Sequence, residues 1–325
     1  MPSTPMLTLL EEDKHWWFAT RTRAILVYLD RFVGPGEGRR VLDIGCGFGI
    51  WGFLSRYCLD IVPGRVNPDS WQVRVDGIEV FEPYIQPHHR ALYNSIRIAD
   101  VRDVADALDP YDLIIAGDVI EHLDKEEGHK VFERLYGKAV KGLLVNIPIG
   151  PGWEHPEAHG NPAELHRSQW EIADFDAYPS VCKEFELPCG KYASFLFKPN
   201  VPIHERVEWL QGRAHCYEAG GNGGRALECM RIAHGLDASD AKATLFLVDL
   251  LIKGQEWSEA LQALEASLVA APTFHYARLT MARLLKLRSR PQEAQACIET
   301  LLASDDVPPE IATDALALLE EVRKQ

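Results

Sequence analysis

The sequence lacks the patterns that mark secreted, zinc-ribbon and membrane proteins. Its seven cysteines are scattered and form no CxxC pair, which argues for free thiols in a reducing compartment rather than disulfides or a zinc ribbon. No uninterrupted apolar run approaches the ~18–20 residues that a membrane-spanning helix needs. The N-terminal stretch has no basic segment followed by an apolar core, as a signal peptide would have. We therefore expect a cytoplasmic protein without a membrane partner.

Positive charge is also scarce. The formal net charge is −14 and the pI is about 5.3, so the chain lacks the overall field that attracts phosphate backbones. The densest basic stretch, residues 283–290, has the pattern of the solvated side of a helix. We therefore expect no nucleic-acid partner.

The sequence divides into two parts that differ in their pattern of apolar residues. Between residues 39 and 200, short runs rich in Val, Ile and Leu alternate with helical stretches. These runs show little polar alternation, which is typical of strands buried on both faces of a sheet. Strands that alternate with helices indicate an α/β fold with a doubly wound, mostly parallel sheet, a Rossmann-like arrangement. We expect strands at 39–45, 73–80, 95–100, 111–117, 142–148 and 193–199, the last antiparallel at an edge, and helices at 49–58, 83–93, 119–139 and 168–176.

Residues 204–325 show only helical patterns, with a period of 34 residues. The alanines that mark the period are Ala226, Ala260 and Ala294. A 34-residue period with small residues where two helices approach is typical of the tetratricopeptide (TPR) repeat. The sequence departs from the TPR pattern at one position early in each repeat. The family has an aromatic residue there, whereas this chain has Leu210, Thr244 and Arg278. We expect an all-α domain of three TPR-like repeats with a capping helix at 308–323; a generic helical bundle is the alternative.

Three glycines follow the first expected strand in the stretch DIGCGFG (43–49). Glycine permits positive φ and lets a ligand approach the backbone closely, and the following helix offers free N–H groups. Because nucleotide, flavin and nicotinamide folds all use such a turn, the glycines alone do not identify the ligand. Asp43, directly before the turn, would repel a pyrophosphate but can bind an ammonium group. This favours a cofactor with an amino-acid group and a sulfonium over a dinucleotide.

Acids also end the next three expected strands. Glu79 ends the second strand and is placed to accept hydrogen bonds from ribose hydroxyls. Asp100 ends the third, where it can accept from an exocyclic amine, and Val101 offers an apolar contact to a purine. Asp118 follows the fourth, at the carboxyl edge where open α/β sheets bind ligands. Each acid alone is better explained as a cap or turn residue, but four at the same ends of successive strands indicate one site.

With this ordered run of motifs, residues 11–198 resemble the class I S-adenosylmethionine-dependent methyltransferases. The resemblance implies that S-adenosylmethionine is the cofactor and that Gly117 and Asp118 border the methyl acceptor. The cofactor-binding residues that it implies are Arg21, Asp43, Gly45, Cys46, Gly47, Gly49, Glu79, Asp100, Val101 and Asp118.

Two features qualify these assignments. Arg21 lies in the stretch HWWFATRTR (15–23), which resembles the lid helix of many such enzymes, where an arginine meets the cofactor carboxylate. Plain core packing is the alternative for its two tryptophans. The gap between Asp43 and Glu79 is longer than is usual in the family, because residues 59–71 have the pattern of an inserted loop; Glu82 is the fallback ribose ligand.

Two histidines are candidates for the general base that removes a proton from an acceptor hydroxyl. His122 begins the expected helix after the fourth strand, and His166 lies between the fifth strand and the next helix. A purely structural role is the alternative for each.

A divalent metal is a further alternative that we do not favour. Asp118, Glu121 and His122 are spaced i, i+3 and i+4, so on a helix they would share one face. With His166 or His159 they could form a site of oxygen and nitrogen ligands. The metal ligands are therefore left unassigned.

The irregular segment 150–170 is rich in Trp, His and Pro and leaves the carboxyl end of a strand. Long irregular loops inside a compact domain are usually functional, so we expect this one to form the acceptor pocket. Trp153 and Trp170 could stack on a ring of the acceptor or pack in the core.

We therefore expect an enzyme, a methyltransferase that acts on an oxygen of a small molecule or glycan precursor, with TPR-like repeats that recruit a substrate or protein partner. A protein methyltransferase recruited through the repeats and a non-catalytic, cofactor-binding scaffold are the alternatives. The expected domains are an N-terminal lid at 1–38, the methyltransferase domain at 39–200 and the repeats at 204–325.

Overall fold

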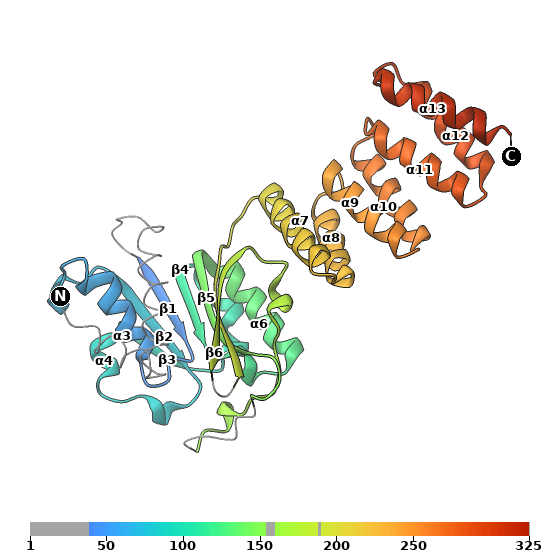
Figure 1. Cartoon of the computed structure of the whole chain (residues 1–325). Coiled ribbons are helices and arrows are strands. Elements are labelled where there is room, and N and C mark those ends of the chain that lie inside the picture. The colour runs from blue at the N-terminus through green and yellow to red at the C-terminus, as the bar shows by residue number, and fades with distance from the viewer. Residues whose placement is uncertain (1–38, 154–159, 188–189, 325) are drawn as a thin grey trace, which may run out of the picture. The chain divides into compact units, whose positions relative to one another are not determined.

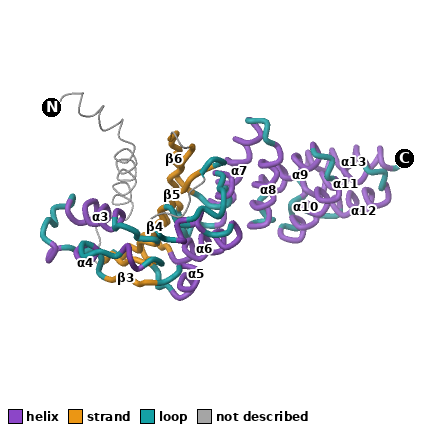
Figure 2. The backbone as a smooth tube through the Cα atoms, turned by 90° about the horizontal axis from the view of Figure 1, so that it is seen from below, coloured by secondary structure: helices purple, strands orange, loops and turns teal. Residues whose placement is uncertain are grey.

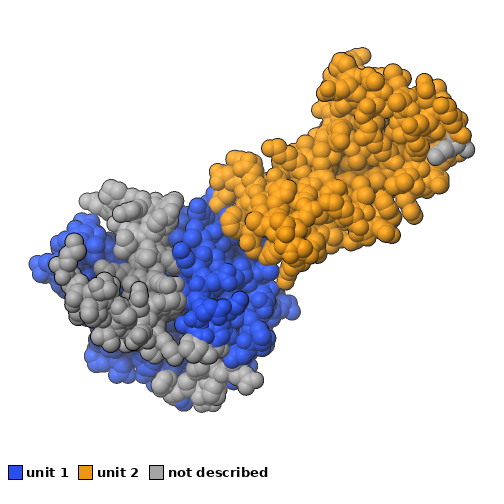
Figure 3. Space-filling view, in the orientation of Figure 1, with its two compact units in different colours: residues 1–200 blue, residues 201–325 orange. Residues whose placement is uncertain are grey.

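The computed structural model describes residues 39–153, 160–187 and 190–324. The chain forms two compact units, residues 1–200 and residues 201–325 (Figure 3). The expected lid, residues 1–38, lies outside the described residues. In the described ranges, no helix combines the length and the apolar character that crossing a membrane requires.

The N-terminal unit is built on a sheet whose described strands follow the order β3-β2-β1-β4-β5-β7-β6 (Figure 1). The strands are β1 (Arg40–Ile44), β2 (Arg74–Glu79), β3 (Ser95–Ile98), β4 (Tyr111–Gly117), β5 (Ala139–Ile149), β6 (Ser180–Leu187) and β7 (Gly190–Phe197). Strands β1 to β5 pair in parallel, and β7 is antiparallel to both β5 and β6. The expected α/β fold with a mostly parallel sheet is confirmed.

Helices cover both faces of this sheet. They are α3 (Ile50–Arg56), α4 (His89–Leu92), α5 (Val101–Val104) and α6 (Lys125–Lys138). In β4, Ile114 and Ala116 join a buried cluster that includes Phe132 of α6. The alternate residues Leu113 and Ile115 join a cluster on the other face with residues of α3. Burial on both faces explains why the strands lack polar alternation.

Two strands differ from the sequence expectation. The sequence pattern does not predict β6 (SVCKEFEL), because most of its side chains are at least partly exposed and many are polar. The expected edge strand, β7, is antiparallel as anticipated, but it lies between β5 and β6 and is not at the edge.

Three expected helices are shorter than the sequence pattern indicates. The stretch 83–93 contains a 3-10 turn and the short helix α4, since Pro87 disfavours the helical conformation of the residue before it. The stretch 168–176 holds only the 3-10 turn η7 (Ile172–Phe175). The stretch 119–139 divides into the 3-10 turn η5 (Ile120–His122) and α6. His122 therefore does not begin an α-helix, and the expected shared helical face does not form.

The described residues of the C-terminal unit are helices joined by short loops (Figure 2). The helices are α7 (Ile203–Ala219), α8 (Gly223–Leu236), α9 (Ala241–Lys253), α10 (Trp257–Ala270), α11 (His275–Leu287), α12 (Pro291–Leu302) and α13 (Pro309–Val322). Consecutive helices pack against each other along the unit. The expected all-α repeat fold is confirmed, and α13 occupies the expected capping stretch.

Burial in this unit follows the 34-residue period. The alanines Ala226, Ala260 and Ala294 are completely buried, which lets neighbouring helices approach closely. Thr244, which replaces an expected aromatic residue, is also buried, and its hydroxyl lies 2.5 Å from that of Ser267. This hydrogen bond compensates for burying a polar side chain at the position.

Candidate active site

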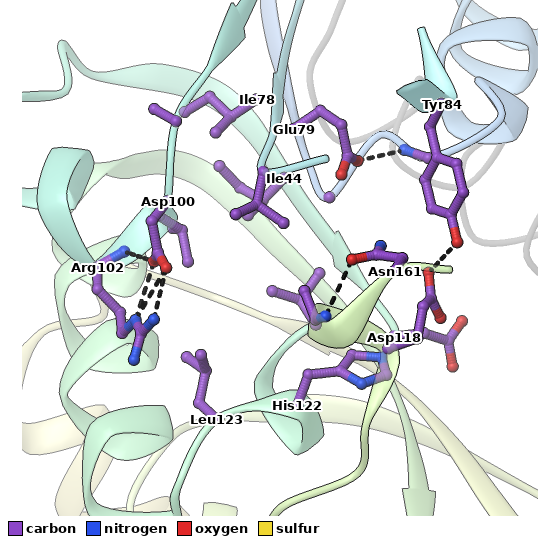
Figure 4. A pocket seen from close by; sticks show the side chains of 18 of the residues that line it. Ile44, Ile78, Glu79, Tyr84, Asp100, Arg102, Asp118, His122, Leu123 and Asn161 are labelled. Atoms are coloured by element: carbon purple, nitrogen blue, oxygen red, sulfur yellow. Dashed lines mark hydrogen bonds and ion pairs between the residues drawn. The ribbon is translucent and has the colours of Figure 1, made fainter. Parts of the chain in front are cut away.

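A partly open cavity of about 350 Å³ lies at the carboxyl ends of the parallel strands (Figure 4). Of the residues predicted to bind the cofactor, those that line it are Gly45, Gly47, Glu79, Asp100, Val101 and Asp118. Asp43 lies in β1, and Cys46 and Gly49 lie in the loop; none of the three is part of the lining. Arg21 lies outside the described residues. The cavity therefore brings the carboxyl ends of four strands to one space.

The glycine loop, residues 45–49, adopts positive φ angles that glycine allows and other residues disfavour. Gly45 and Gly47 have φ of 65° and 46°, in the left-handed region. A Cβ on Gly45 would lie only 2.8 Å from a methyl group of Val119. A side chain at this position would therefore both strain the backbone and collide with the residue after Asp118.

Glu79 fixes the loop from the neighbouring strand. Its carboxylate is almost fully buried and accepts 2.8 Å hydrogen bonds from the backbone N–H groups of Gly47 and Phe81. It also lines the cavity, whereas the fallback residue Glu82 is exposed and does not. The geometry favours Glu79 over Glu82 as the acid that faces a ligand.

Asp43 lies beneath the loop, away from the cavity lining. It is completely buried, and its Oδ2 accepts a 2.6 Å hydrogen bond from the hydroxyl of Tyr93. Burial, together with the nearby charge of Glu79, raises the pKa of Asp43 to about 7. This position suits a residue that supports the loop better than one that directly contacts an ammonium group.

Asp100 is held by the arginine two residues after it. Both carboxylate oxygens accept hydrogen bonds from the Arg102 guanidinium, and Oδ1 also accepts one from its backbone N–H. The bonds from Arg102 lower the pKa of Asp100, so the carboxylate stays ionised. Its exposed edge remains in the cavity lining next to Val101.

Asp118 stands at the bend after β4 with a φ of 55°. Its Oδ1 accepts a 2.6 Å hydrogen bond from the hydroxyl of Tyr192, a residue of β7. Burial and the charges of Asp118 and Glu121 raise the pKa of Tyr192, which keeps this phenol protonated and donating. A residue of the antiparallel strand thus orients the acid at the end of a parallel one.

His122 and His166 meet although 44 positions separate them in the sequence. Their rings lie 4.9 Å apart, edge to face, and His122 lines the cavity while His166 does not. Glu121 lies beside them. A carboxylate oxygen of Glu121 and one ring nitrogen of each histidine all lie within 4.8 Å of one another. Burial and the charge of Asp118 raise the pKa of Glu121 well above its usual value. These side chains offer the nitrogen and oxygen ligands of a divalent metal site.

The segment 160–170 lines the other side of the cavity. Asn161 and Glu164 lie in the lining, and Tyr84 donates a 3.0 Å hydrogen bond to Glu164 (Figure 4). Trp170 is completely buried and stacks on Phe175, so of the two alternatives given above it packs in the core. His159, named above as a metal candidate, lies outside the described residues.

Residues 17–136 match the family model described as "Methyltransferase domain". The N-terminal unit carries a methyltransferase domain. This match and the fold confirm the expected resemblance to class I methyltransferases, whose cofactor is S-adenosylmethionine. No curated protein matches the sequence.

Several solved structures are similar to parts of this chain. One is magnesium protoporphyrin IX methyltransferase from Synechocystis PCC 6803 with bound SAM, with 16% identity, 57% of this chain and 80% of that chain covered, and a TM-score of 0.41. The second TPR domain of human RPAP3, in complex with an HSP70 peptide, has 18% identity, covers 38% of this chain and 100% of its own, and has a TM-score of 0.32. The Yersinia enterocolitica type III secretion chaperone SycD, in complex with a YopD peptide, has 18% identity and a TM-score of 0.32. The match covers 37% of this chain and 94% of SycD.

Sequence reasoning about the methyltransferase domain overlooked several residues of its cavity. Tyr84, Asn161, Glu164 and Arg167 all lie in the lining. The irregular composition of 150–170 identifies the segment that contains three of them, but no pattern identifies the individual side chains. Tyr93, which supports Asp43, carries no sequence signal because its partner lies 50 residues earlier.

Proposed function

We propose that this chain transfers the methyl group of S-adenosylmethionine to an oxygen of a small molecule or glycan precursor. The observation that carries the proposal is the single cavity that joins Glu79 and Asp100 at one part of its lining to Asp118 and His122 at another. A site for a cofactor and a candidate base for its acceptor thereby share one space.

The residues of the cavity suit the parts of this cofactor. Glu79 uses one lone pair of each carboxylate oxygen for a backbone N–H, which leaves lone pairs for ribose hydroxyls. Asp100 can accept from an exocyclic amine, with Val101 beside the purine. When bound, the cofactor supplies an electrophilic methyl group on a sulfonium. Glycines at 45 and 47 leave room for the methionine part at the loop.

His122 is the proposed base on the acceptor side. A hydroxyl becomes a competent nucleophile as its proton leaves, and an imidazole is suited to accept that proton near neutral pH. Asp118, held by Tyr192, lies four residues before His122 and is placed to orient the acceptor. The contribution of the protein is then positioning and proton removal.

A second candidate is metal-assisted transfer, favoured by the convergence of Glu121, His122 and His166 within 4.8 Å. A divalent cation would offset the cost of burying the Glu121 carboxylate, and it would lower the pKa of an acceptor hydroxyl bound to it. In that case His122 serves as a ligand and cannot serve as the base. Metal binding therefore separates the two candidates.

The repeats are proposed to recruit a protein partner or to present the substrate. Stacked helical repeats form extended surfaces that suit peptides, and the 34-residue period of buried alanines supports a regular stack. The same surface would serve the alternative function, methylation of a protein side chain.

The deciding experiment is calorimetric titration of S-adenosylhomocysteine into the full chain and into two variants. Glu79→Ala removes the carboxylate that holds the loop and is expected to weaken binding by at least about tenfold, since it leaves two backbone N–H groups without their acceptor. Glu82→Ala is the matched control, because Glu82 is exposed and outside the cavity. Absence of binding to the folded wild type would overturn the proposal, and the cofactor-binding scaffold with it.

A further inference from the structure

We propose that Arg167 binds an oxyanion of the methyl acceptor, so that the acceptor class is one carrying a carboxylate or phosphate group. The inference rests on the function proposed above and specifies its substrate. The evidence for it is the way in which the charged side chains that line the cavity are paired.

Six charged side chains from the described residues line the cavity: Glu79, Asp100, Arg102, Asp118, Glu164 and Arg167. Five of them already have a partner within the protein. Glu79 accepts from backbone N–H groups, Asp118 from Tyr192 and Glu164 from Tyr84. Asp100 and Arg102 pair with each other. In the described part of the chain, no hydrogen bond or ion pair engages the guanidinium of Arg167.

The backbone fixes the base of the Arg167 side chain beside the proposed reaction site. Its N–H donates a 2.8 Å hydrogen bond to the carbonyl oxygen of Glu121, and the N–H of Ser168 donates to the same oxygen. Glu121 stands directly before His122. On the other side, the buried indole of Trp170 donates a 2.9 Å hydrogen bond to the Ser168 hydroxyl. The chain is anchored while the Arg167 side chain remains exposed to solvent.

Several arginines of this acidic chain pair with a carboxylate. Within the same unit, Arg56 pairs with Asp60 at 3.1 Å and Arg74 with Asp76 at 2.7 Å. Arg167 pairs with neither Asp118 nor Glu164, although both line the same cavity. Its guanidinium therefore keeps its donors for a ligand.

The charge of the cavity makes such a cation necessary for an anionic acceptor. Four carboxylates in the lining would repel a carboxylate or phosphate group. A guanidinium offsets that repulsion, and its planar fork matches two oxygens of either group in a bidentate pair. A neutral acceptor would leave Arg167 without a partner in the bound state.

The test compares anionic and neutral probes that share a phenyl ring on protein saturated with S-adenosylhomocysteine. Benzoate and phenyl phosphate are titrated against neutral benzamide, with affinities measured by ligand-observed NMR at low ionic strength. The wild type is expected to bind at least one anion about tenfold more tightly than benzamide, which corresponds to about 1.4 kcal/mol. Whichever anion binds more tightly identifies the group.

The variants assign this preference to one side chain. Arg167→Gln is expected to abolish the preference, and Arg167→Lys to keep part of it, because the charge remains without the fork. Arg90→Gln is the matched control, since Arg90 is an exposed arginine outside the cavity. Equal affinities in the wild type, or a preference that survives Arg167→Gln, would overturn the inference alone. A wild type that does not bind S-adenosylhomocysteine would instead overturn the proposed function.

Discussion

The hydroxyl of Tyr93 donates a 2.6 Å hydrogen bond to Asp43 directly beneath the glycine loop. The same hydroxyl oxygen accepts a 3.0 Å hydrogen bond from the backbone N–H of Gly52, in α3. The pair therefore ties the end of β1 to the helix that follows the loop. Both side chains are buried, so their interaction contributes to stability in a low-dielectric environment.

The buried carboxyl of Asp43 makes stability depend on pH. Its pKa is about 7 in the folded chain against 3.8 ordinarily, so between these values the folded state holds a proton that the unfolded state has released. The contribution of Asp43 is fully present below pH 3.8 and is lost as the pH rises through 7. The free energy of unfolding of the wild type, relative to Asp43→Asn, should fall by on the order of 2–4 kcal/mol from pH 4 to pH 8.

Urea unfolding at both pH values measures this difference. Asp69→Asn is the control, because Asp69 is exposed in a turn, and its difference from the wild type should stay constant. An Asp43→Asn difference that is equally constant would contradict the raised pKa.

Removing the hydroxyl of Tyr93 should destabilise the N-terminal unit. Tyr93→Phe leaves the buried Asp43 without its donor and the Gly52 N–H without its acceptor. We expect a loss of roughly 1–3 kcal/mol in the free energy of unfolding, measured by thermal and urea denaturation. Tyr276→Phe, at a half-exposed position in the other unit, should change it by less than about 0.5 kcal/mol.

His122→Gln separates binding from chemistry. A general base contributes typically 10²–10⁴-fold, so we expect kcat for an acceptor found by screening to fall by about that factor. The affinity for S-adenosylhomocysteine should stay within about twofold, as a base on the acceptor side contributes little to holding the cofactor. His129→Gln, outside the cavity, should keep both values. A fall in cofactor affinity that matches the fall in kcat would instead assign His122 to cofactor binding.

Metal binding is tested with Mn²⁺, whose free concentration is read by electron paramagnetic resonance. If Glu121, His122 and His166 are ligands, then Glu121→Gln and His166→Gln should each weaken Mn²⁺ binding at least about tenfold. His88→Gln is the control, because His88 is exposed and lies outside the cluster. Equal Mn²⁺ affinity in the wild type and in both ligand variants would exclude this site and leave His122 as the proposed base.

The 34-residue period predicts which substitutions lower the free energy of unfolding of the C-terminal unit. Leu264 follows the marker alanine of α10 by four positions and is completely buried, so Leu264→Ala should cost about 2–5 kcal/mol in unfolding of the C-terminal unit. Leu316→Ala makes the same change at a half-exposed position of α13 and should cost much less. Similar losses for both variants would argue against the 34-residue packing pattern.

Local patterns in the sequence determined which stretches are buried and on how many faces. The apolar runs of β1, β4 and β5 predict a sheet covered on both sides, and the 34-residue period predicts the buried alanines of the second unit. The sequence also predicts that the acids at the strand ends lie together, since parallel strands bring their carboxyl ends to one edge of the sheet. Periodicity therefore predicts the fold and the position of Glu79, Asp100 and Asp118.

The tertiary structure alone decided how side chains meet across long separations in the sequence. Asp43 is turned beneath the loop toward Tyr93, while His166 reaches His122 through the path of a loop without periodicity. The left-handed bend at Asp118 ends the strand, and His122 falls in a short turn ahead of α6, where the pattern predicts one helix. A polar side chain has no local preference that reveals a distant partner, because the hydrogen bond or charge that selects its position exists only after the chain has packed.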